Sequence, residues 1–251
     1  MITPAALPGR PPPRPTGIAP FVPPVLPEDA GPRYQARCEA LGPKDEAPIP
    51  DALPVHPSAN DYPMLPLGEL RALAADIAEK GLQRKIVLHD GKVVDGRNRL
   101  AASLLGGTPP QFEPWAGRGG SVDAFIESEN DRRRHSSPTV RAAVAAFRAQ
   151  RLLGDGPSPL SVDKALKKAA ESTPGAGIYG TRTLFQAAQK TPEVLDLARK
   201  GKLSIEETKR LRGMPEAERE KAVDAIKAGA AASDVVPPAA PRPRQPPPLT
   251  L

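Results

Sequence analysis

The chain has 251 residues, enough for one or two domains, and its 35 Lys and Arg against 29 Asp and Glu give a net charge of +6. This balance favours a polyanionic partner without identifying one. The single cysteine, Cys38, excludes an intramolecular disulfide and any site built from several cysteines. Aromatic residues make up only 4%, which leaves few stacking surfaces for single-stranded nucleic acid. No apolar run approaches membrane-spanning length and no signal-peptide pattern opens the chain, so we expect a cytoplasmic protein without a membrane partner.

Proline is concentrated at the two ends of the chain, which holds 34 prolines. The first stretch contains "PGRPPPRPTGIAPFVPP" and the last contains "PPAAPRPRQPPP". Proline fixes φ and removes a backbone donor, and neither stretch carries periodic apolar residues. We therefore expect residues 1–52 to be a disordered proline-rich arm and residues 231–251 a disordered proline-rich tail. These segments would either keep the protein soluble and act as linkers, or bind a partner protein.

The first predicted domain, residues 53–136, mixes helix and strand signals. A helix that stops at Gly81 is predicted by apolar residues at helical spacing, namely Leu67, Leu70, Leu73 and Ile77. "KIVLHDGKVVDG" follows, and its two β-rich runs around Asp-Gly predict a hairpin. "RNRLAASLLGG" then predicts a helix ending at a glycine, and "TPPQFEPW" a loop leading into or containing another strand. The apolar run in "SVDAFIESEN" fits either a short helix or a strand.

The second predicted domain, residues 137–230, carries helix signals throughout. Pro138 suits the first turn of the helix "PTVRAAVAAFRAQRLL", and Ser161 suits the N-cap of "VDKALKKAAE". "TRTLFQAAQK" predicts a further short helix, and three more follow, each ending at a glycine. The expected fold class is therefore an α+β domain followed by an all-α domain.

The stretch "KVVDGRNRLAA" is a candidate phosphate site, because it places Gly96, Arg97, Asn98 and Arg99 where a strand gives way to a helix. A helix N-terminus exposes free backbone N–H groups, and its dipole favours an anion there. Glycine lets a phosphate approach closely, and the arginines would add charge-assisted contacts. The alternative is a plain strand-turn-helix corner with solvated arginines.

A second polar cluster, "ESENDRRRH", lies further along the same domain. Glu129 and Asn130 offer the hard oxygen ligands that suit a magnesium ion held partly by substrate phosphates. Arg133 and the arginines beside it supply positive charge for the same anion. A solvated charge run is the alternative. Two phosphate-compatible segments in one small domain favour a shared site.

The two segments resemble the paired boxes of the ParB/sulfiredoxin-like superfamily, in particular the ParB-like N-terminal domain. The first box, "GxxRxxA", follows a strand and opens a helix, and it is matched by Gly96, Arg99 and Ala102. The second box, "ENxxR", precedes a helix that begins with proline, and it is matched by Glu129, Asn130 and Arg133. The resemblance implies CTP or another nucleoside triphosphate, bound with Mg²⁺ between the boxes.

On this resemblance, the expected nucleotide-binding residues are Gly96, Arg97, Asn98, Arg99, Asn130 and Arg133, and the expected metal ligands are Glu129 and Asn130. Asn98 stands where partition proteins usually carry arginine. Sulfiredoxin needs a catalytic cysteine in the first box. None is present in this chain, which excludes sulfinic-acid repair.

The segment "VDKALKKAAESTPGAGIYGTRTLFQAAQK" resembles the helix-turn-helix that often follows the ParB-like domain. Its second helix, residues 181–190, would enter the major groove of duplex DNA. The expected base or phosphate contacts on that helix are Thr181, Arg182, Thr183, Gln186 and Lys190. The lysines near the DNA backbone would be Lys164, Lys167 and Lys168. The alternative is an ordinary helical bundle with a basic surface.

The function expected from these features is that of a ParB-like DNA-binding protein with a nucleotide-phosphate-binding domain, acting in plasmid or phage partition or in transcriptional regulation. Its candidate partners are double-stranded DNA, a partner ATPase and a second copy of the chain in a transient homodimer. The alternative is an enzyme, either a metal-dependent nuclease or a weak CTPase or other nucleotide triphosphatase of the ParB-like group. An adaptor that recruits partners through its proline-rich arms is a third hypothesis.

Overall fold

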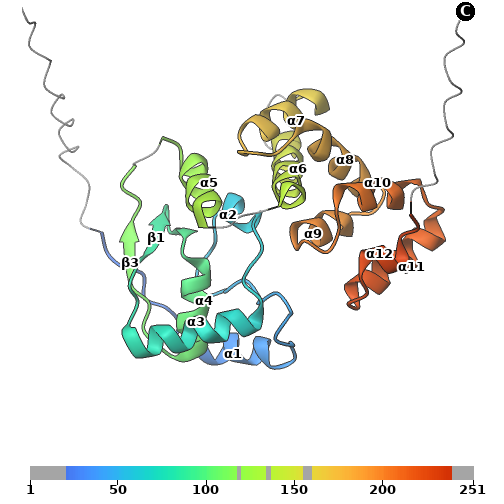
Figure 1. Cartoon of the computed structure of the whole chain (residues 1–251). Coiled ribbons are helices and arrows are strands. Elements are labelled where there is room, and N and C mark those ends of the chain that lie inside the picture. Colours follow the sequence, from blue (N-terminus) through green and yellow to red (C-terminus); the bar gives the residue numbers. More distant parts are fainter. Residues whose placement is uncertain (1–20, 118–119, 134–136, 155–159, 239–251) are drawn as a thin grey trace, which may run out of the picture.

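The computed structural model describes residues 21–117, 120–133, 137–154 and 160–238, with the backbone alone at 131–133 (Figure 1). The rest of the predicted arm and tail, residues 1–20 and 239–251, lies outside these ranges. The described chain is α+β and mostly helical, with one small sheet. A part built around the sheet comes first, and a wholly helical part follows it (Figure 1).

The sheet has the strand order β2-β1-β3, formed by β1 (Ile86–His89), β2 (Lys92–Asp95) and β3 (Phe112–Pro114). β1 and β2 are antiparallel, whereas β3 runs parallel to β1. The predicted hairpin is confirmed. Asp90 and Gly91 have φ values of 47° and 71°, the backbone that a two-residue Asp-Gly turn requires. The strand expected near "QFEPW" is confirmed as β3.

The helices of the first part are α1 (Ala30–Glu39), α2 (Pro57–Asn60), α3 (Leu67–Lys80), α4 (Arg97–Gly106) and α5 (Val122–Arg133). α4 packs against both α1 and α3. Leu70, Ile77 and Leu100 are buried between these helices and the sheet. The predicted helix stops are confirmed, because Gly81 and Gly107 are the C-caps of α3 and α4. The ambiguous run before residue 130 is a helix, α5.

Helix α1 corrects the expectation that the chain is disordered through residue 52. Tyr34 and Cys38, one helical turn apart, are buried in the core beneath α4. The Tyr34 hydroxyl donates a hydrogen bond to the carbonyl of Pro48, 2.8 Å away, which fixes the segment after the helix. Pro32 falls in the first turn of α1, where its missing N–H has no partner within the helix. The high proline content therefore led to a prediction of disorder, although Tyr34 and Cys38 have the spacing of a helix with one buried face.

The second part contains α6 (Pro138–Gly154), α7 (Val162–Glu171), α8 (Ile178–Ala188), α9 (Glu193–Arg199), α10 (Ile205–Gly213), α11 (Glu216–Lys227) and α12 (Ala232–Val235). The predicted cap is confirmed at Ser161, which accepts a hydrogen bond from the N–H of Lys164. Ser204 forms a capping box with Glu207 at the start of α10. α12 shortens the expected disordered tail, because Ala232 and Val236 are buried.

Helix α6 is the central element of the second part, and α7, α8 and α9 all pack against it. One face of α6 is built from alanines, and Ala142, Ala146 and Ala149 are fully buried. These short side chains let the neighbouring helices approach closely. None of the helices within the described ranges combines the length and the apolar character that crossing a bilayer requires.

The seam between the two parts is built largely from ion pairs. On one side, Arg151 binds Asp61 with both of its terminal nitrogens. On the other, Arg199 and Lys200 bind the carboxylate of Glu46, at 3.3 and 3.1 Å. A small apolar cluster, in which Val144 of α6 packs with Ile126, Val94 and Tyr62, completes the contact. The helical part is therefore held beside α5 and β2, next to the candidate phosphate segments.

Candidate functional site

The two sequence segments that were predicted to share a phosphate site line one cavity. The cavity has a volume of about 400 Å³ and lies where β2 ends and α4 begins. Its polar walls come from residues 95–99 on one side, and from Asn130 of α5 and Arg84, just before β1, on the other. Ala59, Leu65, Leu73, Val93 and Val94 complete it. The structure therefore brings the first box and part of the second together.

Gly96 is the N-cap of α4 and sets the backbone geometry at the start of that helix. Its φ of 92° and ψ of 19° lie in the left-handed region, and a Cβ there would stand 2.7 Å from Nη2 of Arg99. Glycine is favoured here by the backbone, because other residues rarely adopt this φ, while a Cβ would also displace the end of the Arg99 side chain. Gly96 provides no side-chain cap, so the N–H groups in the first turn of α4 keep the polarity that attracts an anion.

The arginines of the first box are held by the protein itself. Arg97 is buried and donates hydrogen bonds to the carbonyls of Tyr62 and Pro63. Arg99 forms an ion pair with Asp95 in which Nη2 lies 2.8 Å from Oδ2. Arg97 is therefore a structural anchor for the loop before α3, while Arg99, half-buried at the cavity wall, stays the better phosphate candidate.

Asn98 also holds a neighbouring loop in place. Its side-chain oxygen accepts a hydrogen bond from the N–H of Leu65 at 3.1 Å. An arginine, as partition proteins usually carry there, has no acceptor to offer that N–H. Asn98 thus ties the loop around Leu65 to α4 and shapes one wall of the cavity.

On the α5 side, Asn130 donates from its side-chain nitrogen to the carbonyl of Ile126, 2.8 Å away. Glu129 forms an ion pair with Arg84, with 3.2 Å between Oε2 and Nη2. Sequence reasoning overlooked Arg84, because only the fold brings the residues before β1 next to α5. The side chain of Arg133, the last residue of α5, lies outside what the structure describes.

The expected magnesium ligands have other partners in this structure. Glu129 is paired with Arg84, and Asn130 uses its amide nitrogen within α5. The described residues contain no group of three or more His, Cys, Asp or Glu side chains that could hold a metal ion.

The predicted helix-turn-helix corresponds to α7 and α8, joined by residues 172–177. Lys164, Lys167 and Lys168 are exposed on α7, and Arg182, Gln186 and Lys190 are exposed on or just after α8. Thr181 and Thr183 are buried, which corrects their assignment as DNA contacts. The Thr181 hydroxyl donates to the carbonyl of Gly177 at 3.0 Å, inside the helix.

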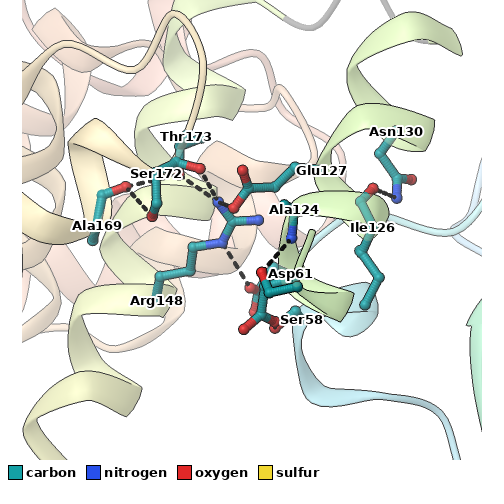
Figure 2. Close-up of polar contacts among 12 residues, drawn as sticks. Ser58, Asp61, Ala124, Ile126, Glu127, Asn130, Arg148, Ala169, Ser172 and Thr173 are labelled. Atoms are coloured by element: carbon teal, nitrogen blue, oxygen red, sulfur yellow. Dashed lines mark hydrogen bonds and ion pairs between the residues drawn. The ribbon is translucent and has the colours of Figure 1, made fainter. Parts of the chain in front are cut away.

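Arg148, which no sequence motif singled out, joins the two parts of the chain (Figure 2). Its buried guanidinium binds Glu127 of α5 and approaches Asp61 after α2. It also donates to the carbonyl of Ser172 at 2.9 Å and to the hydroxyl of Thr173 at 2.7 Å. One side chain therefore links α5 with the turn between α7 and α8. A charged residue within an alanine-rich helix was the signal that could have revealed it.

The resemblance to the ParB-like domain rests on residues that the structure now places. Gly96, Arg99 and Asn130 line one cavity, and the candidate helix-turn-helix lies beyond the ion-paired seam. No family model and no curated protein matches the chain.

Proposed function

We propose that the chain is a ParB-like DNA-binding protein whose first part binds the phosphates of a nucleoside triphosphate, with CTP as the first candidate. The observation that carries this proposal is the single cavity lined by residues 95–99 and by Asn130. Segments that carry phosphate-binding features far apart in the sequence come together there. Plasmid or phage partition and transcriptional regulation are the processes in which such a protein would act.

The cavity suits a phosphate chain in both size and charge. Its volume of about 400 Å³ is within the ordinary range of roughly 300–1,000 Å³ for small-molecule sites. The uncapped first turn of α4 favours an anion, and Arg84 and Arg99 both line the cavity. Both arginines are paired with carboxylates, Glu129 and Asp95, which would turn toward the bound cation or toward solvent as phosphate takes their place.

The helical part supports binding to duplex DNA through its charge. α7 exposes Lys164, Lys167 and Lys168 on one surface, and α8 exposes Arg182 and Gln186 beside it. Lysines of this kind bind phosphates without reading sequence, and most protein–DNA hydrogen bonds go to phosphate and sugar.

Calorimetric titration with CTP, ATP and GTP in the presence of magnesium tests the nucleotide half of the proposal. Arg84→Ala should weaken binding by a factor of roughly 10 to 100, because a hydrogen bond to a charged group contributes about 1.5–3 kcal/mol. Arg33→Ala is the matched control, since Arg33 is also an exposed arginine with one carboxylate partner, Asp29, but does not line the cavity. Absence of binding by all three nucleotides would contradict this half.

A salt series on duplex DNA, followed by fluorescence anisotropy, tests the other half. If the four basic side chains Lys164, Lys167, Lys168 and Arg182 each neutralise one phosphate, the plot of log K against log salt should have a slope near −3.6. A protein without detectable affinity at low salt would not be the DNA-binding protein proposed. Plasmid nicking and phosphate release, measured in the same samples, report on the enzymatic alternative.

A further inference from the structure

Three large apolar side chains are exposed in the first turns of α7 and α8. Val162 is 48% exposed at the start of α7, and Ile178 and Tyr179 are 43% and 58% exposed at the start of α8. Elsewhere on the two helices the apolar residues Leu166, Leu184 and Phe185 are buried. The exposure therefore does not follow from a loosely packed helix pair.

These side chains belong to one surface. Arg182 lies one helical turn after Ile178 and Tyr179, and it forms an ion pair with Asp163, the neighbour of Val162, at 2.9 Å. The first turns of α7 and α8 therefore stand side by side. We name the surface made of Val162, Ile178 and Tyr179 the exposed apolar patch, and Arg182 lies at its edge.

The rotation of α8 about its axis is fixed by its packing. A Cβ on Gly180 would lie 2.7 Å from Cδ1 of Ile205 and 3.1 Å from Cβ of Ala142, so this side of the helix is in tight contact with α10 and α6. Positions one and two turns along from Ile178, which are Arg182 and Gln186, are exposed. The outward stripe of α8 is consequently Ile178, Tyr179, Arg182 and Gln186, and it leaves out the two threonines favoured by the sequence.

The charges around the exposed apolar patch point to a polyanion. Three exposed lysines follow Val162 along α7, namely Lys164, Lys167 and Lys168. Asp163 and Glu171 on the same helix carry negative charge and offset part of their positive charge. The N-cap of α8, Gly177, has no side-chain cap, so the first-turn N–H groups of α8 also favour a phosphate. Apolar side chains set among phosphate-binding groups match the major groove, where the methyl group of thymine lies next to the DNA backbone.

We propose that Ile178 and Tyr179 contact thymine methyl groups in the major groove and so set a preference for A·T pairs at the base steps facing the start of α8. This rests on the proposed binding of duplex DNA by the helical part. Arg182 leaves Asp163 to bind a neighbouring phosphate or base. Asp163 therefore opposes binding in the free chain, and its charge restrains affinity.

Selection of bound duplexes from a random pool, followed by anisotropy titration of the preferred site, tests the proposal. The thymines of that site are then replaced by deoxyuridine, which removes only the methyl group. Each methyl that is buried by the full-length chain should contribute about a fourfold change in affinity. Tyr179→Ala should weaken binding to the thymine site by a similar or larger factor and should distinguish thymine from uracil less than the unchanged chain does, and the double variant Ile178→Ala/Tyr179→Ala should not distinguish them.

Two control variants separate the outcomes. Ile49→Ala removes an exposed apolar side chain of the first part and should leave both affinities unchanged. Asp163→Asn should strengthen binding severalfold through the loss of one negative charge beside Arg182. If the chain binds DNA but Tyr179→Ala still distinguishes thymine from uracil as the unchanged chain does, the proposal is overturned while DNA binding stands. If no duplex binds, both are overturned.

Discussion

Replacing Arg148 by methionine removes the guanidinium that joins α5 to the turn between α7 and α8. The change keeps an unbranched apolar side chain about as long as the stem of the arginine while deleting the guanidinium and its charge. The Arg148 side chain is 6% exposed, and its partners Glu127 and Asp61 are 13% and 4% exposed. Breaking a buried pair by removing one partner costs about 3–5 kcal/mol, because the remaining charge loses its compensation.

The lower end of that range applies to this chain. Asp61 keeps Arg151, which binds both of its oxygens, so the charge of Asp61 remains compensated. The bonds to the Ser172 carbonyl and the Thr173 hydroxyl are lost outright. We therefore expect Arg148→Met to lower the free energy of unfolding by about 3 kcal/mol. In a protein of this size, this lowers the melting temperature by about 6–12 °C.

Urea unfolding followed by circular dichroism measures this loss. Arg182→Met is the matched control, because the Arg182–Asp163 pair is exposed and an exposed pair contributes at most about 1 kcal/mol. The control should unfold close to the unchanged protein. A loss below about 1 kcal/mol for Arg148→Met would refute the reasoning, since the guanidinium would then not be a buried junction between the two parts.

Three further predictions concern the packing, the seam and the core. Gly180→Ala should destabilise by about 1 kcal/mol, because crowding of the new Cβ against Ala142 and the end of Ile205 outweighs what alanine gains over glycine within a helix, and an unchanged urea midpoint would contradict the tight contact. The pKa of Asp196 is lowered from 3.8 by hydrogen bonds from Arg199 and Lys200 that outweigh its burial, and the pKa of Lys200 is raised from 10.5 by Asp196 and Glu46 despite burial. The stability from Asp196 is therefore lost as the pH falls below about 4, and that from Lys200 as the pH rises above about 10.5. Between these two pH limits, a Lys200→Met variant should have a lower free energy of unfolding than the unchanged chain. Outside them, the two free energies should converge. Burial raises the pKa of Cys38, so a thiol reagent should label it only on unfolding, and rapid labelling of the folded chain would place Cys38 outside the core.

Local sequence signals predicted the elements that local physics decides. Asp90-Gly91 defines the hairpin, because positive φ at both positions is easy for these residues and matches the twist of the strands. Gly81 and Gly107 end their helices for a similar reason. Helix α1 was not predicted, because it directly follows a proline-rich stretch whose composition is typical of disorder. The helical spacing of Tyr34 and Cys38 is too short a signal to outweigh that composition.

The candidate site was predicted in its chain positions but not in its geometry. The sequence paired residues 96–99 with Asn130, and both line the cavity. It did not reveal that Arg97 turns inward toward backbone carbonyls, because that depends on the loop before α3. Thr181 and Thr183 were misassigned because α8 begins three residues before the predicted start, and the side that faces the core is decided by contacts with α6 and α10.

The ion-paired seam has a consequence for dividing the chain into fragments. The helical part has its own apolar core, so a fragment from residue 137 onward would retain the packing of α6 to α12. It would lose the carboxylates of Asp61, Glu127 and Glu46, which pair with Arg148, Arg151 and Lys200 in the full chain, while Lys200 would keep Asp196 and Arg148 would keep Ser172 and Thr173. Such a fragment would expose a surface that is more basic than the same surface of the full chain, and would bind any DNA more tightly and less selectively. DNA affinities measured on the fragment would therefore describe the cut surface as well as α7 and α8.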